Sequence, residues 1–94
     1  MKFITKKMIE KDKIKQILKL SRKLGTDSNK LIDMMKRHTH EIKELYDSKN
    51  NHFAVETGDL IILSLQLLMI EGYSIEEIMG KCYDRFDKKF NDAV

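Results

Sequence analysis

The chain has 94 residues, no proline and one cysteine, which bounds it to a single domain that buries only roughly 60–65% of its unfolded surface. A hydrophobic fraction of 41% beside a charged fraction of 35% is typical of a soluble helical protein, and the lone Cys82 excludes an internal disulfide. The N-terminus alternates lysines with apolar residues, so we expect no secretory signal peptide and a cytoplasmic location.

The positive charge is concentrated near the N-terminus. Residues 1–24 contain nine Lys or Arg against two acids, whereas residues 25–94 contain nine against thirteen. Such a segment can contact nucleic acid or polyphosphate, or it can be a solvated helix face that balances the acidic remainder. We favour the solvated face, and we expect neither nucleic acid nor a membrane among the partners.

Two helices are predicted in the first half of the chain. In the first, from about Lys7 to Leu24, apolar side chains recur at helical spacing, and Gly25 provides a C-terminal cap. Residues 26–28, Thr-Asp-Ser, can cap the second helix. The apolar stripe of that helix consists of Leu31, Met34, Met35, His38, Ile42 and Leu45. His38 falls on the stripe and is interpreted as a packing residue rather than a metal ligand.

The third predicted helix, within residues 52–71, combines the most apolar run of the chain with two carboxylates. Residues 60–70 include only two polar side chains, so this helix has to be buried on every side, although the run is too short and interrupted to span a bilayer. Glu56 and Asp59 stand at its start, three residues apart and on one face. An ionised carboxylate removed from water is costly unless a cation meets it.

A second acidic pair with the same spacing, Glu41 and Glu44, precedes the first. A turn at residues 47–51 would join the two helices as an antiparallel hairpin. This turn places Glu44 level with Glu56, and it likewise places Glu41 level with Asp59. Four carboxylates on facing helices form a cage that suits hard divalent cations.

A fourth helix is predicted from about Ile75 to Phe90, with basic residues near its end: Arg85, Lys88 and Lys89. The expected fold is therefore all-α, a four-helix bundle-like single domain. Residues 1–24 supply the basic N-terminal segment and first helix, and residues 27–90 supply the core with the acidic motifs. Because the third helix is apolar all round, a second copy of the chain is the simplest cover, and we expect a dimer.

These motifs together resemble a known family. Glu41-x-x-Glu44, then Glu56-Thr57-Gly58-Asp59-Leu60 running into an apolar helix, then Arg85-Phe86-Asp87-Lys88-Lys89, is similar to the MazG-like all-α nucleoside triphosphate pyrophosphohydrolases over roughly residues 31–90. The resemblance implies hydrolysis of an NTP or dNTP between the α- and β-phosphates, giving a nucleoside monophosphate and pyrophosphate. It also implies assembly as dimers or dimers of dimers.

The resemblance further implies roles for individual residues. The Mg²⁺ ligands, with Mn²⁺ as a substitute ion, would be Glu41, Glu44, Glu56 and Asp59. The phosphate-binding residues would be Arg85, Lys88 and Lys89. The sequence does not single out the carboxylate that orients the attacking water, and Glu44 is the candidate because it lies furthest round the helix from the apolar stripe.

Two alternatives belong to other functional classes. One is a catalytically silent relative that binds nucleotides or another protein through the same bundle. The other is a small basic helical protein that binds nucleic acid through residues 1–24. Release of pyrophosphate from NTPs with Mg²⁺ would separate the enzyme from both, and salt-dependent binding to nucleic acid without hydrolysis would favour the last. The base and sugar preference is not contained in these motifs.

Overall fold

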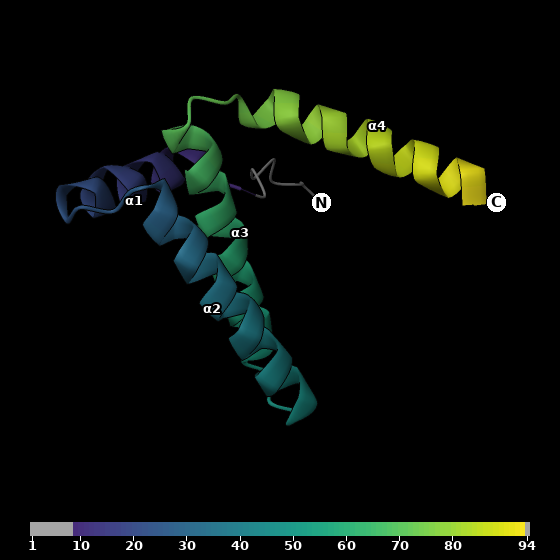
Figure 1. Cartoon of the computed structure of the whole chain (residues 1–94), viewed down its shortest axis with the longest axis horizontal. Helices are drawn as coiled ribbons and strands as arrows, with labels where there is room; N and C mark the ends of the chain where they lie inside the picture. Colours follow the sequence, from purple (N-terminus) through teal and green to yellow (C-terminus); the bar gives the residue numbers. More distant parts are fainter. Residues whose placement is uncertain (1–8, 94) are drawn as a thin grey trace, which may run out of the picture.

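The computed structural model describes residues 9–93 of the chain. Four helices and no strand occur in that range: α1 (Lys11–Lys23), α2 (Ser28–Asp47), α3 (Phe53–Ile70) and α4 (Ile75–Ala93) (Figure 1). The prediction of an all-α single domain with four helices is confirmed. Helix α1 begins at Lys11 rather than near Lys7 as predicted, because Glu10 has an extended backbone and residue 9 is not helical. Residues 1–8 of the basic N-terminal segment lie outside the described residues.

The helix ends follow their sequence signals. The carboxylate of Asp27 caps α2 by accepting the backbone N–H of Lys30 at 2.9 Å. Gly25 after α1 and Gly72 after α3 have φ angles of 85° and 83°, a left-handed conformation that other residues adopt only with strain. The hydroxyl of Ser74 accepts the N–H of Glu77 at 3.3 Å and so caps α4. The boundaries with capping residues or glycines agree with the prediction, whereas α4 continues to Ala93, beyond the predicted end near Phe90.

Helices α2 and α3 form the antiparallel hairpin that the sequence predicts (Figure 1). The connecting turn places Lys49 at a positive φ of 60°. The rings of Tyr46 and Phe53, one on each side of the turn, pack edge to face with centroids 5.4 Å apart. The hairpin therefore holds one face of α2 against one face of α3.

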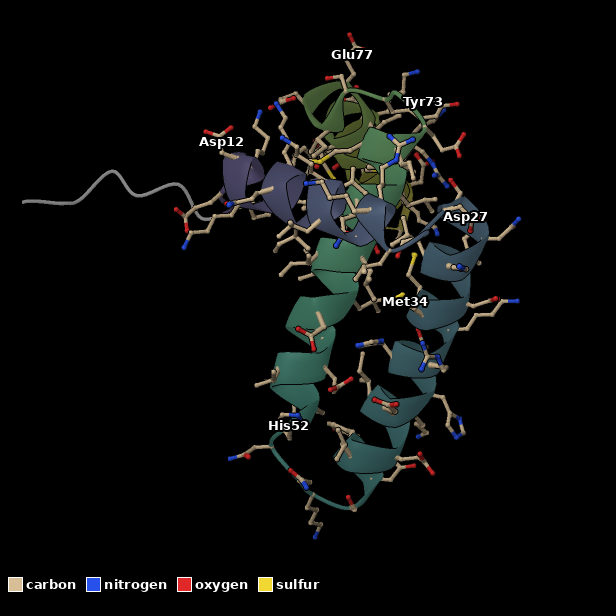
Figure 2. The ribbon with its side chains drawn as sticks, turned by 90° about the vertical axis from the view of Figure 1, so that its left-hand side faces the viewer. Asp12, Asp27, Met34, His52, Tyr73 and Glu77 are labelled. Atoms are coloured by element: carbon tan, nitrogen blue, oxygen red, sulfur yellow. The ribbon has the colours of Figure 1, made fainter. Side chains whose placement is uncertain are left out.

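The buried core lies at the end of the hairpin that is remote from the turn, where α1 packs across α3 (Figures 1 and 2). Its buried residues come from α1, α2 and α3, and they are Ile14, Leu18, Leu31, Leu63, Leu65 and Gln66. The acidic motifs lie nearer the turn than these core residues do.

Helix α4 extends away from the other three (Figure 1). None of its described residues is buried. The rings of Phe86 and Phe90 stack with centroids 6.2 Å apart, and these residues are 57% and 64% exposed. The C-terminal half of the apolar stripe of α4 is thus uncovered in the single chain, whereas its first two turns are half-buried.

Helix α3 is also poorly covered. Its 18 residues have a mean hydropathy of 1.7, and by length and composition alone the helix is apolar enough to cross a membrane. The apolar run of residues 60–70, too short by itself to span a bilayer, is only part of this helix. Only 17% of those residues are buried, and Val55 and Ile61 are 55% and 49% exposed. The single chain therefore leaves apolar surface on both α3 and α4 in water, at a cost of roughly 25 cal/mol per Å².

Candidate metal centre

Three side chains with metal-binding atoms converge where α2 faces α3. The imidazole Nε2 of His38 lies 3.4 Å from Oε1 of Glu56 and 3.8 Å from Oδ2 of Asp59. His38 and Glu56 are largely covered, with side chains 20% and 14% exposed, whereas Asp59 is 48% exposed. One donor atom from each residue lies within 4.8 Å of the other two. We call these three residues the His38 cluster.

Glu56 is the residue least satisfied by its surroundings. Its Oε1 atom is buried and has no hydrogen-bond partner within the described part of the chain. Its Oε2 atom lies 3.6 Å from Nε2 of His52, which is more than half exposed at the end of the turn (Figure 2). A buried, unpaired carboxylate oxygen is unfavourable unless a cation or a donor reaches it.

The surroundings raise the pKa of Glu56 above its ordinary value of 4.5. Burial is the largest cause, because it penalises the ionised form. The neighbouring carboxylate of Glu41 raises the pKa further, and that of Asp59 adds to this, while His38 acts in the opposite direction. Without a cation, the protein therefore holds Glu56 in an environment that disfavours its charge.

The raised pKa of Glu56 predicts that the difference in melting temperature between wild type and Glu56→Gln depends on pH. Between pH 4.5 and the raised pKa, folded Glu56 binds more protons than unfolded Glu56, so its contribution to stability is lost as pH rises. In EDTA, the melting temperature of Glu56→Gln should therefore increasingly exceed that of wild type as pH rises above about 4.5, and then level off. Thermal unfolding monitored by circular dichroism, from about pH 4 to 8, measures this difference. An Asp33→Asn control should track wild type, and a difference that does not vary with pH would contradict the assignment.

The structure brings together three of the four predicted carboxylates and places the fourth elsewhere. Glu41 is close enough to influence Glu56, which in turn lies in the His38 cluster with Asp59. Glu44 instead directs Oε1 to Nε2 of His40, at 3.5 Å, and its side chain is 66% exposed. Helical phase explains the difference, because Glu44 lies about a third of a turn from His38 around α2.

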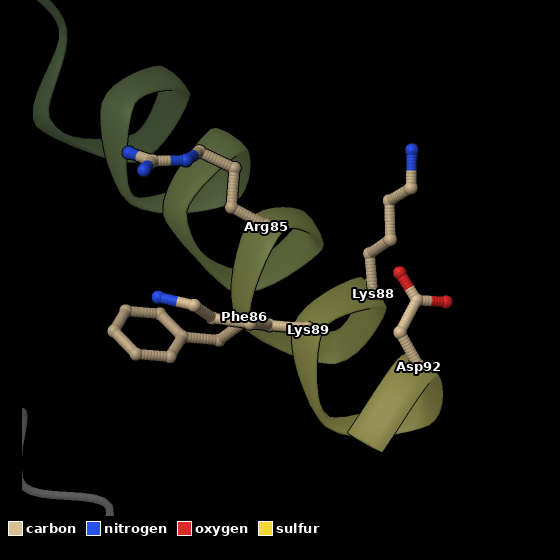
Figure 3. Close-up of a pocket in the computed structure, with 5 residues that line it drawn as sticks. All are labelled: Arg85, Phe86, Lys88, Lys89 and Asp92. Carbon is tan, nitrogen blue, oxygen red and sulfur yellow. The ribbon is translucent and has the colours of Figure 1, made fainter. Parts of the chain in front are cut away.

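The predicted phosphate-binding residues lie together but far from the His38 cluster in the single chain. An open hollow of about 370 Å³ on α4 is lined by Arg85, Phe86, Lys88, Lys89 and Asp92 (Figure 3). All five residues belong to α4, which extends away from the hairpin (Figure 1). The basic residues therefore do not share a pocket with the acidic ones within one chain.

A second cavity, of about 340 Å³, adjoins the His38 cluster. His38 and Asp59 form part of its wall, and the remaining lining comes from α1, α2, α3 and the α1–α2 connection: Ile17, Ser21, Thr26, Leu31, Met34, Ile62, Leu63 and Gln66. Gln66 is only 3% exposed, yet it has an amide group that can donate and accept hydrogen bonds. A mostly apolar cavity with a few polar groups is typical of small-molecule sites.

The donor atoms of the His38 cluster fit a divalent cation. Two carboxylates and one imidazole supply oxygen and nitrogen ligands, and Glu41 adds another carboxylate nearby. A cation would also meet the otherwise unpaired Oε1 of Glu56. In the free protein, repulsion between the carboxylates and burial of their charge are unfavourable. A bound cation would offset both costs.

Two residues of this region were not recognised from the sequence. His38 was interpreted as a packing residue because it falls on the apolar stripe of α2, but its ring lies against Glu56 and Asp59. The signal available in the sequence was its spacing, since His38 precedes Glu41 by three residues and thus extends the acidic face by one turn. Gln66 was noted only as a polar interruption of an apolar run.

Comparison of the chain with protein-family models, curated proteins and solved structures finds no match.

Proposed function

We propose that this chain is a divalent-metal-dependent nucleotide pyrophosphohydrolase, acting in the cytoplasm, that cleaves an NTP or dNTP into a nucleoside monophosphate and pyrophosphate. The observation that carries the proposal is the buried oxygen of Glu56, which has no hydrogen-bond partner among residues 9–93 and faces His38 beside the carboxylates of Asp59 and Glu41. The motifs that resemble the MazG-like enzymes support the same reading. An acidic centre of this kind suits phosphate chemistry, which depends on positioning and on charge neutralisation.

Glu41, Glu56 and Asp59 would hold the ion, Mg²⁺ in the family that the motifs resemble. When bound, such an ion neutralises phosphate oxygens and lowers the pKa of water. The contribution of the chain is to fix the carboxylates on two rigid helices, so that the α-phosphate is held in one orientation. Partial burial of Glu56 strengthens its electrostatic interactions compared with those of an exposed carboxylate.

The reaction adds one water across the α–β anhydride. The oxygen of water forms a bond to the α-phosphorus, the bond from that phosphorus to the bridging oxygen breaks, and the bridging oxygen leaves with pyrophosphate. The proton from water needs a basic group outside the ligands of the ion. Glu44, the candidate from the sequence, is the carboxylate that we propose for this role; in the single chain its Oε1 faces Nε2 of His40.

The cavity next to the His38 cluster is where we place the nucleoside. It shares His38 and Asp59 with the cluster, so a phosphate held there would direct the rest of the molecule along the apolar wall. The amide of Gln66 offers a donor and an acceptor to the edge of a base. This arrangement is our basis for proposing a nucleotide rather than inorganic polyphosphate as the substrate.

The basic residues of α4 enter this proposal through a second copy of the chain. In one chain, Arg85, Lys88 and Lys89 project from a helix that extends away from the hairpin (Figures 1 and 3). A dimer in which α4 of one subunit packs on the uncovered face of the other's α3 would bury both apolar surfaces. It would also bring basic groups toward the acidic centre, where leaving pyrophosphate needs positive charge.

The direct experiment is a panel of NTPs and dNTPs assayed for pyrophosphate release, with Mg²⁺, with Mn²⁺ and with EDTA. We expect metal-dependent release from at least one nucleotide and none from inorganic triphosphate. Release of orthophosphate in place of pyrophosphate would refute the proposed bond cleavage. Nucleotide binding without any turnover would favour the catalytically silent alternative.

A further inference from the structure

His38 has a fixed ring orientation. Its Nδ1 lies 2.8 Å from the backbone oxygen of Met34, one turn earlier on α2. Since a carbonyl oxygen only accepts hydrogen bonds, Nδ1 must carry the proton and donate it. In the neutral imidazole, Nε2 then has a free lone pair, and carboxylate oxygens of Glu56 and Asp59 lie within 4 Å of this nitrogen. A histidine that donates one ring N–H to the backbone and presents the other nitrogen is in the orientation used by metal ligands.

The distances around Nε2 fit shared coordination better than direct hydrogen bonding. At 3.4 Å and 3.8 Å from the carboxylate oxygens, Nε2 is farther than the range of about 2.7–3.2 Å for an N–H to oxygen hydrogen bond. Two ligand atoms that each lie about 2.1 Å from one tetrahedral ion are themselves about 3.4 Å apart. The nearer of these two oxygens is Oε1 of Glu56, the atom that is buried and has no partner in residues 9–93.

We propose that His38 is a metal ligand together with Glu56 and Asp59, and that this centre selects a first-row transition ion such as Zn²⁺ over Mg²⁺. Imidazole nitrogen is a good ligand for Zn²⁺, whereas Mg²⁺ takes oxygen ligands and keeps several waters. The role of such an ion in catalysis rests on the proposed function, but its binding does not. Within the resembled family motifs, the ligands are carboxylates only, so His38 distinguishes this chain from what those motifs imply.

Isothermal titration of the full chain with Zn²⁺ and with Mg²⁺ tests the proposal. Wild type should bind Zn²⁺ more tightly than Mg²⁺, and His38→Gln should weaken Zn²⁺ binding at least about tenfold while changing Mg²⁺ binding little. His40→Gln is the matched control, because His40 is a neighbouring histidine on α2 that is 75% exposed and faces Glu44 instead. This control should bind Zn²⁺ as wild type does, with Cys82→Ser in all proteins to remove a competing thiol.

Misfolding of His38→Gln would also weaken Zn²⁺ binding, so a second measurement uses the His38 ring of wild type. In wild type, nuclear magnetic resonance of the imidazole nitrogens should show a shift of the Nε2 signal of His38 when one equivalent of Zn²⁺ is added, with Nδ1 still protonated. Equal affinity of wild type for the two ions, or an unchanged Nε2 signal, would overturn the proposal. Zn²⁺ binding through His38 without any nucleotide hydrolysis would instead refute the proposed function and leave the metal site standing.

Discussion

Glu56→Gln is expected to reduce nucleotide hydrolysis at least about a hundredfold while leaving the protein folded. The amide keeps the shape of the side chain but removes the charge that would hold the ion. Asp59→Asn should have a similar effect, because Oδ2 of Asp59 lies 3.8 Å from the same Nε2 of His38 and would hold the same ion. Pyrophosphate release under saturating metal measures the loss, and circular dichroism measures the fold.

Glu56→Gln should also stabilise the metal-free protein. Loss of hydrolysis together with a gain in stability distinguishes a metal ligand from a residue that only supports the fold. Replacing Glu56 removes a buried carboxylate whose pKa is raised by burial and by Glu41. Added divalent metal should raise the melting temperature of wild type but not that of Glu56→Gln. Asp33→Asn, which alters an exposed carboxylate on α2, should retain both activity and the response to metal. Unchanged turnover in Glu56→Gln and Asp59→Asn would remove the metal-site hypothesis.

Mixing two inactive variants should restore part of the activity, because each site would take residues from two subunits. Glu56→Gln removes the acidic centre, and Arg85→Ala with Lys88→Ala removes the basic one. If α4 serves the partner's centre, a random mixture of the two contains about a quarter of its sites with both parts intact. Activity should therefore recover to about a quarter of wild type after the two proteins are unfolded and refolded together. No recovery would mean that both parts act within one chain, or that α4 takes no part.

A surface substitution tests the same assembly physically. Phe86→Glu on α4 and Ile61→Glu on α3 should each give an 11.1 kDa monomer in light scattering, because both residues are exposed and apolar on faces that the single chain leaves uncovered. Leu24→Glu is the control, since Leu24 is 85% exposed at the end of α1. Wild type that is already a monomer and active at micromolar concentration would exclude the dimer.

Local sequence signals predicted the four helices and those of their ends that carry a capping residue or a glycine, but not the start of α1 or the end of α4. Capping residues such as Asp27 and glycines with positive φ act over three or four residues, so they can be recognised without knowledge of the fold. The hairpin was also predictable, since a short turn between two helices makes them antiparallel neighbours. Glu56 and Asp59 were identified because two acids at the start of an apolar helix conflict with burial.

What the sequence did not reveal depends on rotation about the helix axes and on packing between helices. Matching the heights of residues across the hairpin placed Glu44 opposite Glu56, but height alone ignores the direction in which Glu44 points. His38 lies at the centre of the face that meets α3, and its residue type alone did not distinguish a packing role from a ligand. The extended position of α4 could not be inferred either, because its apolar stripe predicts burial without identifying what covers it.

Hydrolysis of the preferred nucleotide in water enriched in oxygen-18 tests the central claim most directly. Attack on the α-phosphorus predicts that the label enters the nucleoside monophosphate, with unlabelled pyrophosphate as the other product and no reaction by Glu56→Gln. Phosphorus-31 nuclear magnetic resonance locates the label, because oxygen-18 shifts the signal of the phosphorus to which it is bonded. Label in pyrophosphate or in orthophosphate, or turnover that persists in EDTA, would contradict a metal-dependent pyrophosphohydrolase.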